Sequence, residues 1–272
     1  MSFPLGAFFA SLGWAALAVL VLLSITFAIG SRIGRHNVVD VAWGGGFGVA
    51  ALAVLLTSFS NGDGLRRVLL LVMVLVWGGR LAFHIAMRGR GKGEDPRYAQ
   101  LLSKAKGNPA WYAFRMIYLL QGVLVLFISL PVQVGMIERG GVTIVGWIGV
   151  VIWAVGLFFE ATGDRQMEQF KSDPANKGKL IDIGLWRYTR HPNYFGDACV
   201  WVGLFLLAAE RWPGVLTMLS PAVIIYLLAF GSGKKLLEKS MAKRPGYADY
   251  QHRTSGFIPL PPKKTGSAKP GG

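Results

Sequence analysis

Long apolar runs dominate the chain, and polar residues gather in the segments between them. A helix needs about 20 mostly apolar residues to cross a bilayer, and seven runs reach or approach that length. These runs cover residues 5–29, 38–59, 67–87, 113–136, 142–163, 196–209 and 213–231. Pro213 stops a helix between the last two, which are also the shortest. The pattern predicts an all-α, polytopic membrane protein with about seven transmembrane helices in one bundle.

Composition supports this fold class and sets the domain boundaries. Hydrophobic residues make up 53% of the chain and charged residues only 16%, whereas soluble domains average about 25% charged residues. We expect one membrane domain over residues 1–258, followed by a disordered Pro/Lys/Gly-rich cytoplasmic tail over residues 259–272. The first run lacks the basic flank and cleavage site of a signal peptide, so we interpret it as a retained helix.

The net charge of +15 is distributed unevenly along this predicted topology. Loops on one side of the seven runs carry 23 Lys and Arg residues, and the opposite loops carry 4. The positive-inside rule then predicts an outside N-terminus and a cytoplasmic C-terminus. A basic cytoplasmic face also attracts anionic lipid or a phosphorylated cofactor. We expect no nucleic acid partner, because the chain has no separate basic soluble domain. The histidines are scattered, so no metal site is expected.

Ionisable residues within apolar runs are functional candidates, because each costs about 2.5–3.5 kcal/mol to insert near the centre of a span. Asp40 opens the second run in DVAWGGGFG, either as part of a substrate site or as an N-cap before a glycine packing groove. Arg80 and His84 form an i, i+4 pair in the third run. Arg80 lies too deep for stabilisation of the helix dipole alone. The GKGEDPRY segment after it (91–98) is either a solvated loop or part of the site.

Three acidic residues repeat every four positions in FFEATGDRQMEQF and therefore share one helical face. Like charges on one stripe destabilise a helix unless they meet donors. Glu168 suits solvent at the end of a span. Glu160 and Asp164 lie deeper, so we expect them to contact arginines or a ligand.

The segment GLWRYTRHPNYFGD (184–197) places polar and aromatic residues before the sixth run. Interfacial anchoring accounts for its aromatic residues and Arg187. It does not account for His191, Asn193 and Asp197 converging at the start of a helix that enters lipid. A turn is expected at HPN, and the segment as a whole indicates a ligand site.

Five motifs resemble those of the steroid 5-alpha-reductase-like membrane reductases, most closely their bacterial, largely uncharacterised branch. They are DVAWG (40–44), RGKGEDPRY (90–98), FExxxDxQ (159–166), GLWRYTRHPNYFGD (184–197) and YxxYQxRTSxFIPLPP (247–262). The resemblance implies seven helices with an outside N-terminus in a bacterial inner membrane. It also implies NADPH in the cytoplasmic half of the bundle, and reduction of a carbon–carbon double bond conjugated to a carbonyl, or of a related sterol alkene.

By this resemblance, the cofactor-binding positions are Arg90, Asp164, Tyr188, Asn193, Asp197 and Trp201, with Asp197 in place of the usual glutamate. The residues themselves add Glu160, Arg187, Arg190, His191 and Tyr194. The added arginines would bind the cofactor phosphates through charge-assisted hydrogen bonds.

The catalytic residues depart from the family pattern. The steroid enzymes polarise the substrate carbonyl with a glutamate in the second span and a tyrosine in the third, and the nearest matches here are Asp40 and Trp77. Tryptophan is no proton donor of that kind, so we expect Asp40 to supply the acid with Arg80 or Tyr98. The resulting hypothesis is an NADPH-dependent oxidoreductase acting on CH–CH groups of a lipophilic substrate that is steroid-, isoprenoid- or fatty-acyl-like.

Two other hypotheses stay open at this point. RHPNYFG is also similar to the protein-prenylcysteine carboxyl methyltransferases, which bind S-adenosylmethionine, so a membrane methyltransferase is the main alternative. The other is a non-enzymatic lipid-binding or assembly protein. FExxxDxQ and DVAWG favour the reductase.

Overall fold

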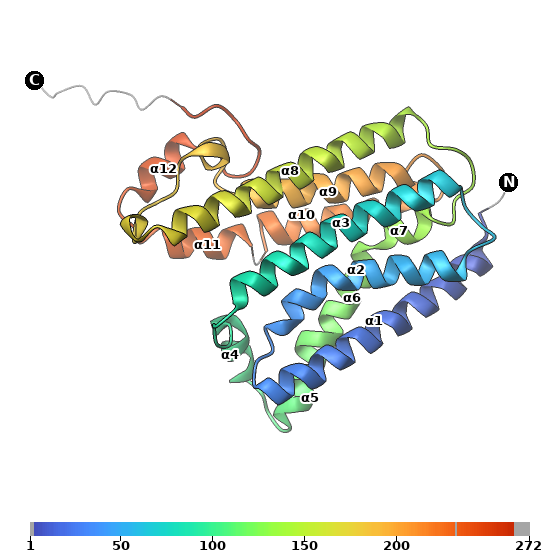
Figure 1. Ribbon diagram of the computed structural model, residues 1–272, viewed down its shortest axis with the longest axis horizontal. Helices are drawn as coiled ribbons and strands as arrows, with labels where there is room; N and C mark the ends of the chain where they lie inside the picture. Colours follow the sequence, from blue (N-terminus) through green and yellow to red (C-terminus); the bar gives the residue numbers. More distant parts are fainter. Residues whose placement is uncertain (1–2, 232, 264–272) are drawn as a thin grey trace, which may run out of the picture. The chain divides into compact units, whose positions relative to one another are not determined.

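The computed structural model describes residues 3–231 and 233–263, and these residues form helices and no strand (Figure 1). The all-α prediction is confirmed. Five helices are long and apolar enough to span a membrane, which makes the chain a multi-pass membrane protein. They are Leu5–Ile33, Val38–Thr57, Gly64–Gly89, Pro109–Ile128 and Ile144–Ser172. The predicted count of seven is not confirmed, because the helices after these five are shorter. Residues 264–272 of the predicted tail lie outside the described residues.

The chain divides into two compact units. Unit 1 comprises Met1–Val150 and Leu204–Ser220, and unit 2 comprises Val151–Gly203 and Pro221–Gly272. The helices before the division are α1 (Leu5–Ile33), α2 (Val38–Thr57), α3 (Gly64–Gly89), α4 (Pro96–Leu102), α5 (Pro109–Ala113), η1 (Phe114–Leu119), α6 (Leu120–Ile128) and α7 (Leu130–Gly135). The later helices are α8 (Ile144–Ser172), η2 (Pro174–Asn176), η3 (Gly184–Arg187), α9 (Pro192–Ala208), η4 (Gly214–Met218), α10 (Leu219–Ala229), α11 (Lys234–Met241) and α12 (Tyr247–Arg253).

Glycines set the spacing of α2 and α3 in unit 1, where α2 packs between α1 and α3. A Cβ atom on Gly44 would lie 2.4 Å from the carbonyl oxygen of Gly78, and a Cβ on Gly78 would lie 2.4 Å from that of Gly44. Small residues permit this close approach of two backbones. Gly44 therefore lies in a helix-packing groove, as one of the two alternatives for this segment predicts. The N-cap alternative does not describe Asp40, because α2 begins at Val38 with Asn37 as its N-cap.

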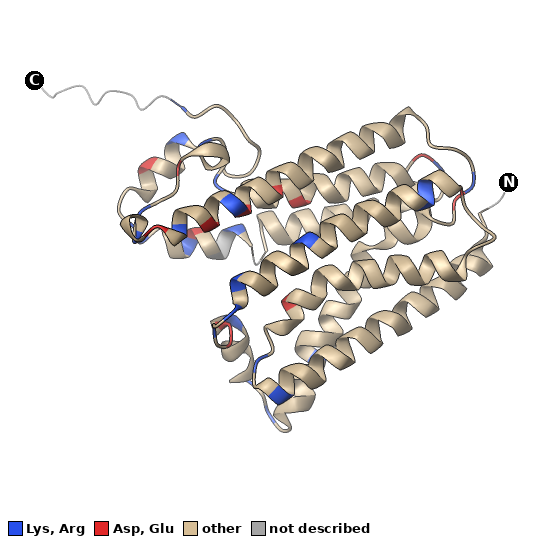
Figure 2. Ribbon diagram, in the orientation of Figure 1, with Lys and Arg blue, Asp and Glu red and all other residues tan. Residues whose placement is uncertain are grey.

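Buried ion pairs tie together three loops of unit 1. Arg66, near the start of α3, donates to Glu210 at 2.8 Å, and its guanidinium lies 3.9 Å from the carboxylate of Glu138. Glu210 also accepts from the backbone N–H of Thr143 at 2.6 Å. Glu138 accepts from the backbone of Gly214 at 3.0 Å. We call Arg66, Glu138 and Glu210 the ion-pair clamp. Figure 2 shows basic residues at both ends of α3, and those at its last turn are exposed.

In unit 2, α8 and α9 pack with their backbones close together. A Cβ on Gly196 would lie 2.5 Å from both the amide nitrogen of Glu160 and the carbonyl oxygen of Gly156. Pro192 is the first residue of α9, so the predicted turn at His191–Asn193 is wrong. Proline suits this position because the first turn of a helix leaves its amide N–H groups unbonded.

The segment before α9 is held between α8 and α12. The indole N–H of Trp186 donates to the Gly163 carbonyl of α8 at 3.1 Å. On the other side, the Tyr250 hydroxyl of α12 donates to the Trp186 carbonyl at 2.7 Å. This arrangement fixes the residues that immediately precede α9.

Candidate functional site

The predicted acidic stripe lies on α8 in unit 2. Glu160 and Asp164 are buried, with relative exposures of 4% and 8%, whereas Glu168 is exposed. This gradient matches the expectation that only Glu168 suits solvent. The two buried carboxylates face the start of α9, since Glu160 adjoins Gly196 and Asp164 meets Asn193.

Asn193 connects α9 to this stripe. Its side-chain amide donates to Asp164 at 3.2 Å, and its carbonyl oxygen accepts from the backbone N–H of Tyr194 at 3.1 Å. Asp197 and Trp201 follow on the same helix at a spacing of four residues, and Trp201 is fully buried. The structure therefore brings together Asp164 and Asn193, which are 29 residues apart in sequence.

A second cluster in unit 2 forms around Glu238 of α11. Its carboxylate accepts from the guanidinium of Arg190 at 2.9 Å and lies 3.2 Å from Nε2 of His191. Arg190 also donates to the carbonyls of Gln251 and Thr254. With these protein partners, Arg190 binds the C-terminal segment to the start of α9, and its role in binding a cofactor stays a prediction.

The imidazole of His191 is held on two sides. It stacks on the ring of Tyr194 with the ring centroids 5.2 Å apart and an interplanar angle of 4°. Burial lowers the pKa of His191, although the Glu238 carboxylate opposes this shift. The ring is therefore neutral near pH 7, and Nε2–H donates to Glu238.

Sequence reasoning missed Glu238. It is an acidic residue in the otherwise basic segment KKLLEKSM, and that contrast is the one signal that could have identified it. Hydrogen bonds from His191 and Arg190 outweigh the effect of burial and lower the pKa of Glu238. It is consequently an anion at neutral pH and orders both residues.

Two residues of the predicted set lie at the surface of unit 2. Tyr188 is 44% exposed and Arg187 is also exposed. Arg187 lines a cavity with residues from α12 and the C-terminal segment. The structure thus places Arg187 in a different neighbourhood from the carboxylates of α8.

In unit 1, the predicted acid pair is in contact. The Tyr98 hydroxyl of α4 donates to the Asp40 carboxylate at 2.5 Å, and the Gln121 side chain donates to that hydroxyl at 3.3 Å. Arg97 lies 3.5 Å from the other carboxylate oxygen of Asp40. Burial, together with the nearby carboxylate, raises the pKa of Tyr98, so the phenol keeps its proton at neutral pH.

The remaining unit 1 candidates lie on α3. Trp77 is buried and packs edge-on against Phe47, with ring centroids 5.4 Å apart. Arg80 is half-buried on the same helix, and Arg90 is the exposed C-cap of α3. The phenol in contact with Asp40 is thus that of Tyr98 on α4, and catalytic or cofactor roles for Tyr98, Arg80 and Arg90 stay predictions.

The GEDPRY segment positions Tyr98. Glu94 accepts hydrogen bonds from the backbone N–H groups of His36 and Asn37 at 2.5 and 3.0 Å. Asp95 caps α4 by accepting from the backbone of Arg97 at 2.8 Å. Glu94 is therefore not part of a freely solvated loop, which is one of the two alternatives for residues 91–98. This loop joins the start of α2 to α4 and so holds Tyr98 beside Asp40. Among the residues that the structure describes, no group of three His, Cys, Asp or Glu side chains could hold a metal ion.

The fold defines a multi-pass helical membrane protein with a buried polar cluster in each unit. The chain belongs to the family described as "Protein of unknown function (DUF1295)", whose model matches residues 26–254. This is the steroid 5-alpha-reductase-like and methyltransferase-like membrane family.

Two curated proteins are similar to the chain. One is "Uncharacterized protein C594.04c" of Schizosaccharomyces pombe, 23% identical over 71% of this chain and 64% of that protein. The other is "Probable O-methyltransferase ustE" of Ustilaginoidea virens, 36% identical over 25% of each chain. The chain thus spans less than two thirds of the length of either relative. No solved structure matches significantly.

Proposed function

We propose that the protein is an NADPH-dependent membrane reductase of a carbon–carbon double bond conjugated to a carbonyl in a lipophilic substrate. The observation that carries this proposal is the hydrogen bond between Tyr98 and Asp40. Reduction of such a bond builds negative charge on the carbonyl oxygen, and a positioned donor lowers that barrier. Methyl transfer to a carboxylate needs no such acid.

The residues of unit 1 divide this work. In the free protein the single hydroxyl proton of Tyr98 points to Asp40. On substrate binding this proton turns to the substrate carbonyl oxygen, while the Gln121 side chain still donates to the phenol oxygen. The raised pKa of Tyr98 keeps the donor protonated over the physiological range. The Arg97 guanidinium lies 3.5 Å from the other carboxylate oxygen of Asp40 and helps to hold that side chain beside Tyr98.

The residues of unit 2 fit a nucleotide cofactor in part. Asp164, Asn193 and Asp197 offer the oxygen acceptors that ribose hydroxyls and a carboxamide need, and Trp201 provides a buried aromatic surface. Arg190 fits less well as a phosphate ligand, because its donors already meet Glu238 and two carbonyls. When bound, NADPH supplies the hydride. The role of the chain is to bind the cofactor and to exclude water around it.

A methyltransferase is the second candidate, and the similarity to a probable O-methyltransferase favours it. The buried carboxylates Glu160 and Asp164 also suit a cofactor that carries positive charge, as S-adenosylmethionine does at its sulfonium and ammonium groups. The two candidates therefore share a binding region and differ in their need for Tyr98.

Thermal stability of the purified full-length protein with each cofactor decides between them. A ligand at 100 times its Kd stabilises the folded state by about 2.7 kcal/mol. We expect NADPH, and not S-adenosylmethionine, to raise the Tm of the parent. Asp164→Ala and Asn193→Ala should lose this response, and Glu168→Ala, an exposed control one turn along α8, should keep it.

The remaining outcomes of this experiment are also informative. A response to S-adenosylmethionine alone would select the methyltransferase. No response to either cofactor, with Asp164→Ala and Asn193→Ala behaving like the parent, would favour the non-enzymatic lipid-binding or assembly protein.

We also propose an outside N-terminus and a cytoplasmic C-terminus in a bacterial inner membrane, supported by the excess of basic residues in one set of loops. A reporter active only in the cytoplasm, fused to the C-terminus, should be active. Activity of a periplasm-specific reporter at that position would reverse the orientation.

A further inference from the structure

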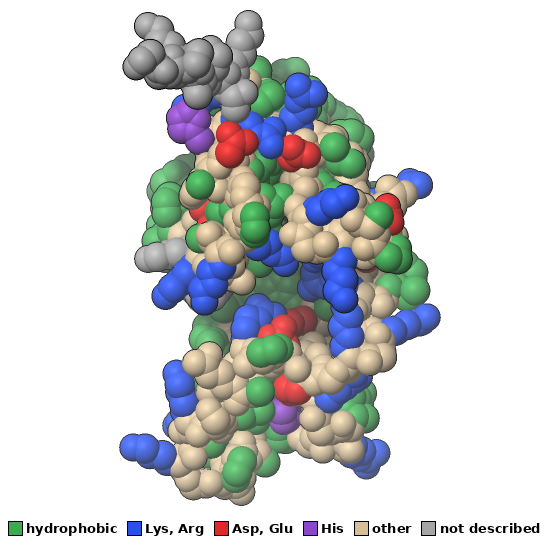
Figure 3. Space-filling model, turned by 90° about the vertical axis from the view of Figure 1, so that its left-hand side faces the viewer, with side chains coloured by type: hydrophobic (Ala, Val, Ile, Leu, Met, Phe, Trp, Pro, Cys, Tyr) green, Lys and Arg blue, Asp and Glu red, His purple; other side chains and the backbone are tan. Residues whose placement is uncertain are grey.

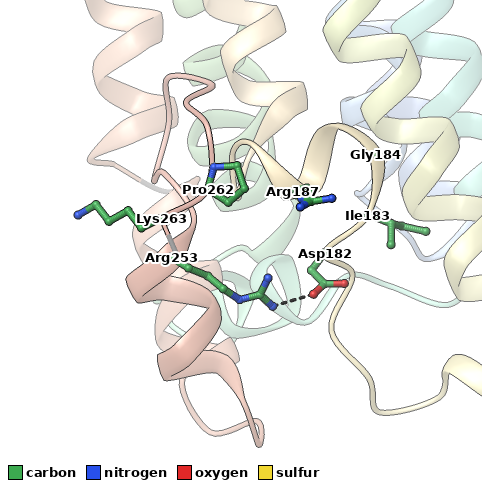
Figure 4. A pocket seen from close by; sticks show the side chains of 7 residues that line it. All are labelled: Asp182, Ile183, Gly184, Arg187, Arg253, Pro262 and Lys263. Carbon is green, nitrogen blue, oxygen red and sulfur yellow. Dashed lines mark hydrogen bonds and ion pairs between the residues drawn. The ribbon is translucent and has the colours of Figure 1, made fainter. Parts of the chain in front are cut away.

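Unit 2 contains a cavity of about 540 Å³, which we call the basic cavity (Figure 4). It is lined by Asp182, Ile183, Gly184, Arg187, Arg253, Pro262 and Lys263. These residues come from the segment around η3, from α12 and from the chain that follows α12. None of them lies on α8 or α9, so the basic cavity is built by a different part of unit 2 from the Asp164–Asn193 pair.

The charges of the basic cavity favour an anion. Three basic side chains line it against one acidic side chain, Asp182. Arg253 donates to Asp182 at 2.7 Å, which neutralises that pair. Arg187 and Lys263 are both exposed and add two positive charges. Arginine and lysine side chains bind phosphate oxygens through charge-assisted hydrogen bonds.

The walls of the basic cavity are anchored. Gly184 adopts a positive φ of 58°, and a Cβ there would lie 2.3 Å from the side chain of Gln166. Gln166 in turn accepts from the backbone N–H of Leu185 at 3.0 Å. On the opposite wall, the backbone N–H of Lys263 donates to the Arg253 carbonyl at 2.9 Å. The cations are therefore presented by fixed backbone.

Exposed apolar side chains, which we call the apolar rim, come from the same two segments as these cations. Ile183, Ile258 and Leu260 are 61%, 60% and 54% exposed, and a backbone hydrogen bond of 3.0 Å joins Leu260 to Tyr188. All four residues lie outside the candidate membrane spans. Figure 3 shows apolar, basic and acidic side chains next to one another in the upper part of its view. Exposed apolar side chains next to cations are typical of a surface that lies against anionic lipid.

We propose that the basic cavity binds the phosphate group of an anionic phospholipid headgroup, with the apolar rim against the membrane interface. Charge complementarity accounts for the phosphate. The exposed isoleucine and leucine side chains account for a lipid rather than a soluble phosphate, which would gain nothing from them. The proposal holds whichever cofactor occupies the stripe on α8.

Lipid retention by the full-length protein tests this site. The protein is purified in mild detergent, incubated with equal amounts of phosphatidylglycerol and phosphatidylcholine, and examined by native mass spectrometry. We expect phosphatidylglycerol to be retained on the order of tenfold more, because each basic residue near anionic lipid contributes about 1 kcal/mol. The double variant Arg187→Gln, Lys263→Gln should lose this preference.

Matched variants separate the cavity from general surface charge. Lys177→Gln with Lys243→Gln removes two exposed cations elsewhere in unit 2 and should keep the preference. Ile258→Ser with Leu260→Ser should reduce retention of both lipids and leave their ratio unchanged. Circular dichroism of each variant verifies folding.

Three results would overturn the proposal. The first is equal retention of the two lipids by the parent, and the second is an equal loss of preference in the cavity variant (Arg187→Gln, Lys263→Gln) and in the control variant (Lys177→Gln, Lys243→Gln). The third is displacement of phosphatidylglycerol by inorganic phosphate or NADPH. The last result would assign the basic cavity to a soluble phosphate ligand.

Discussion

Two polar clusters of unit 1 look alike in the sequence and differ in the structure. The ion-pair clamp and the Asp40–Tyr98 pair both begin with a charged residue near the start of an apolar run. Arg66 of the clamp is fully buried and lies against two carboxylates. Asp40 instead meets a phenol and an arginine whose side chain is 63% exposed.

This difference indicates that the ion-pair clamp has a structural role, whereas the Asp40–Tyr98 pair is the candidate for a reactive one. The clamp joins the first turn of α3 to the loops that precede α8 and η4, and the Arg66 guanidinium neutralises Glu210. In the Asp40–Tyr98 pair the proton stays on the phenol, so the pair retains a donor for a substrate. Position in the sequence alone does not distinguish the two, because the partners come from distant segments.

The largest expected effect is on the stability of the clamp. Arg66→Met leaves Glu210 buried without its ion pair, which costs about 3–5 kcal/mol when one partner of a buried pair is removed. Thermal unfolding in detergent measures the loss. Arg139→Met, at an exposed position of the same unit, should stay within about 0.5 kcal/mol of the parent. Equal losses in the two variants would mean that the clamp contributes nothing particular.

The next effect is on catalysis at the Asp40–Tyr98 pair. Tyr98→Phe removes the proton donor and should lower the rate of NADPH consumption with a lipophilic enone by about a hundredfold or more. Loss of its hydrogen bond should cost only about 1 kcal/mol of stability. Tyr112→Phe on the neighbouring α5 is the control and should keep the parental rate. An unchanged rate in Tyr98→Phe would remove the main support for a reductase.

The sequence predicts those features that depend on local spacing. The long apolar runs predict α1, α2, α3 and α8, and the four-residue repeat correctly predicts one buried and one exposed end of the acidic stripe. The turn predicted at Pro192 is wrong, because proline is compatible both with a turn and with the first residue of a helix.

Features that depend on tertiary contact were not predictable in this way. Glu238 lies 48 residues from Arg190, and Tyr98 lies 58 residues from Asp40. The sequence offers both Arg80 and Tyr98 as partners for Asp40 and does not choose between them. The sequence places Arg66 among the four basic residues of the outer loops. It does not predict the ion pair with Glu210, because no periodicity relates two residues this far apart.

The smallest expected effect is a pH dependence within the clamp. Burial raises the pKa of Glu138 to about 8, although Arg66 opposes this shift. An ordinary glutamate has a pKa near 4.5, so between pH 4.5 and 8 the folded state binds more protons than the unfolded chain. The stabilisation is therefore fully present below about pH 4.5 and is lost as the pH rises through about 8.

We therefore expect the Tm of the parent to fall by several degrees between about pH 5 and pH 8, because the folded state loses this stabilisation over that range. Glu138→Gln removes the titrating group and keeps an acceptor for the Gly214 backbone, so its Tm should change less over the same range. Glu168→Gln, at an exposed position, should retain the parental slope. A parental slope in Glu138→Gln would show that Glu138 does not titrate in this window, and that the clamp holds both of its carboxylates as anions.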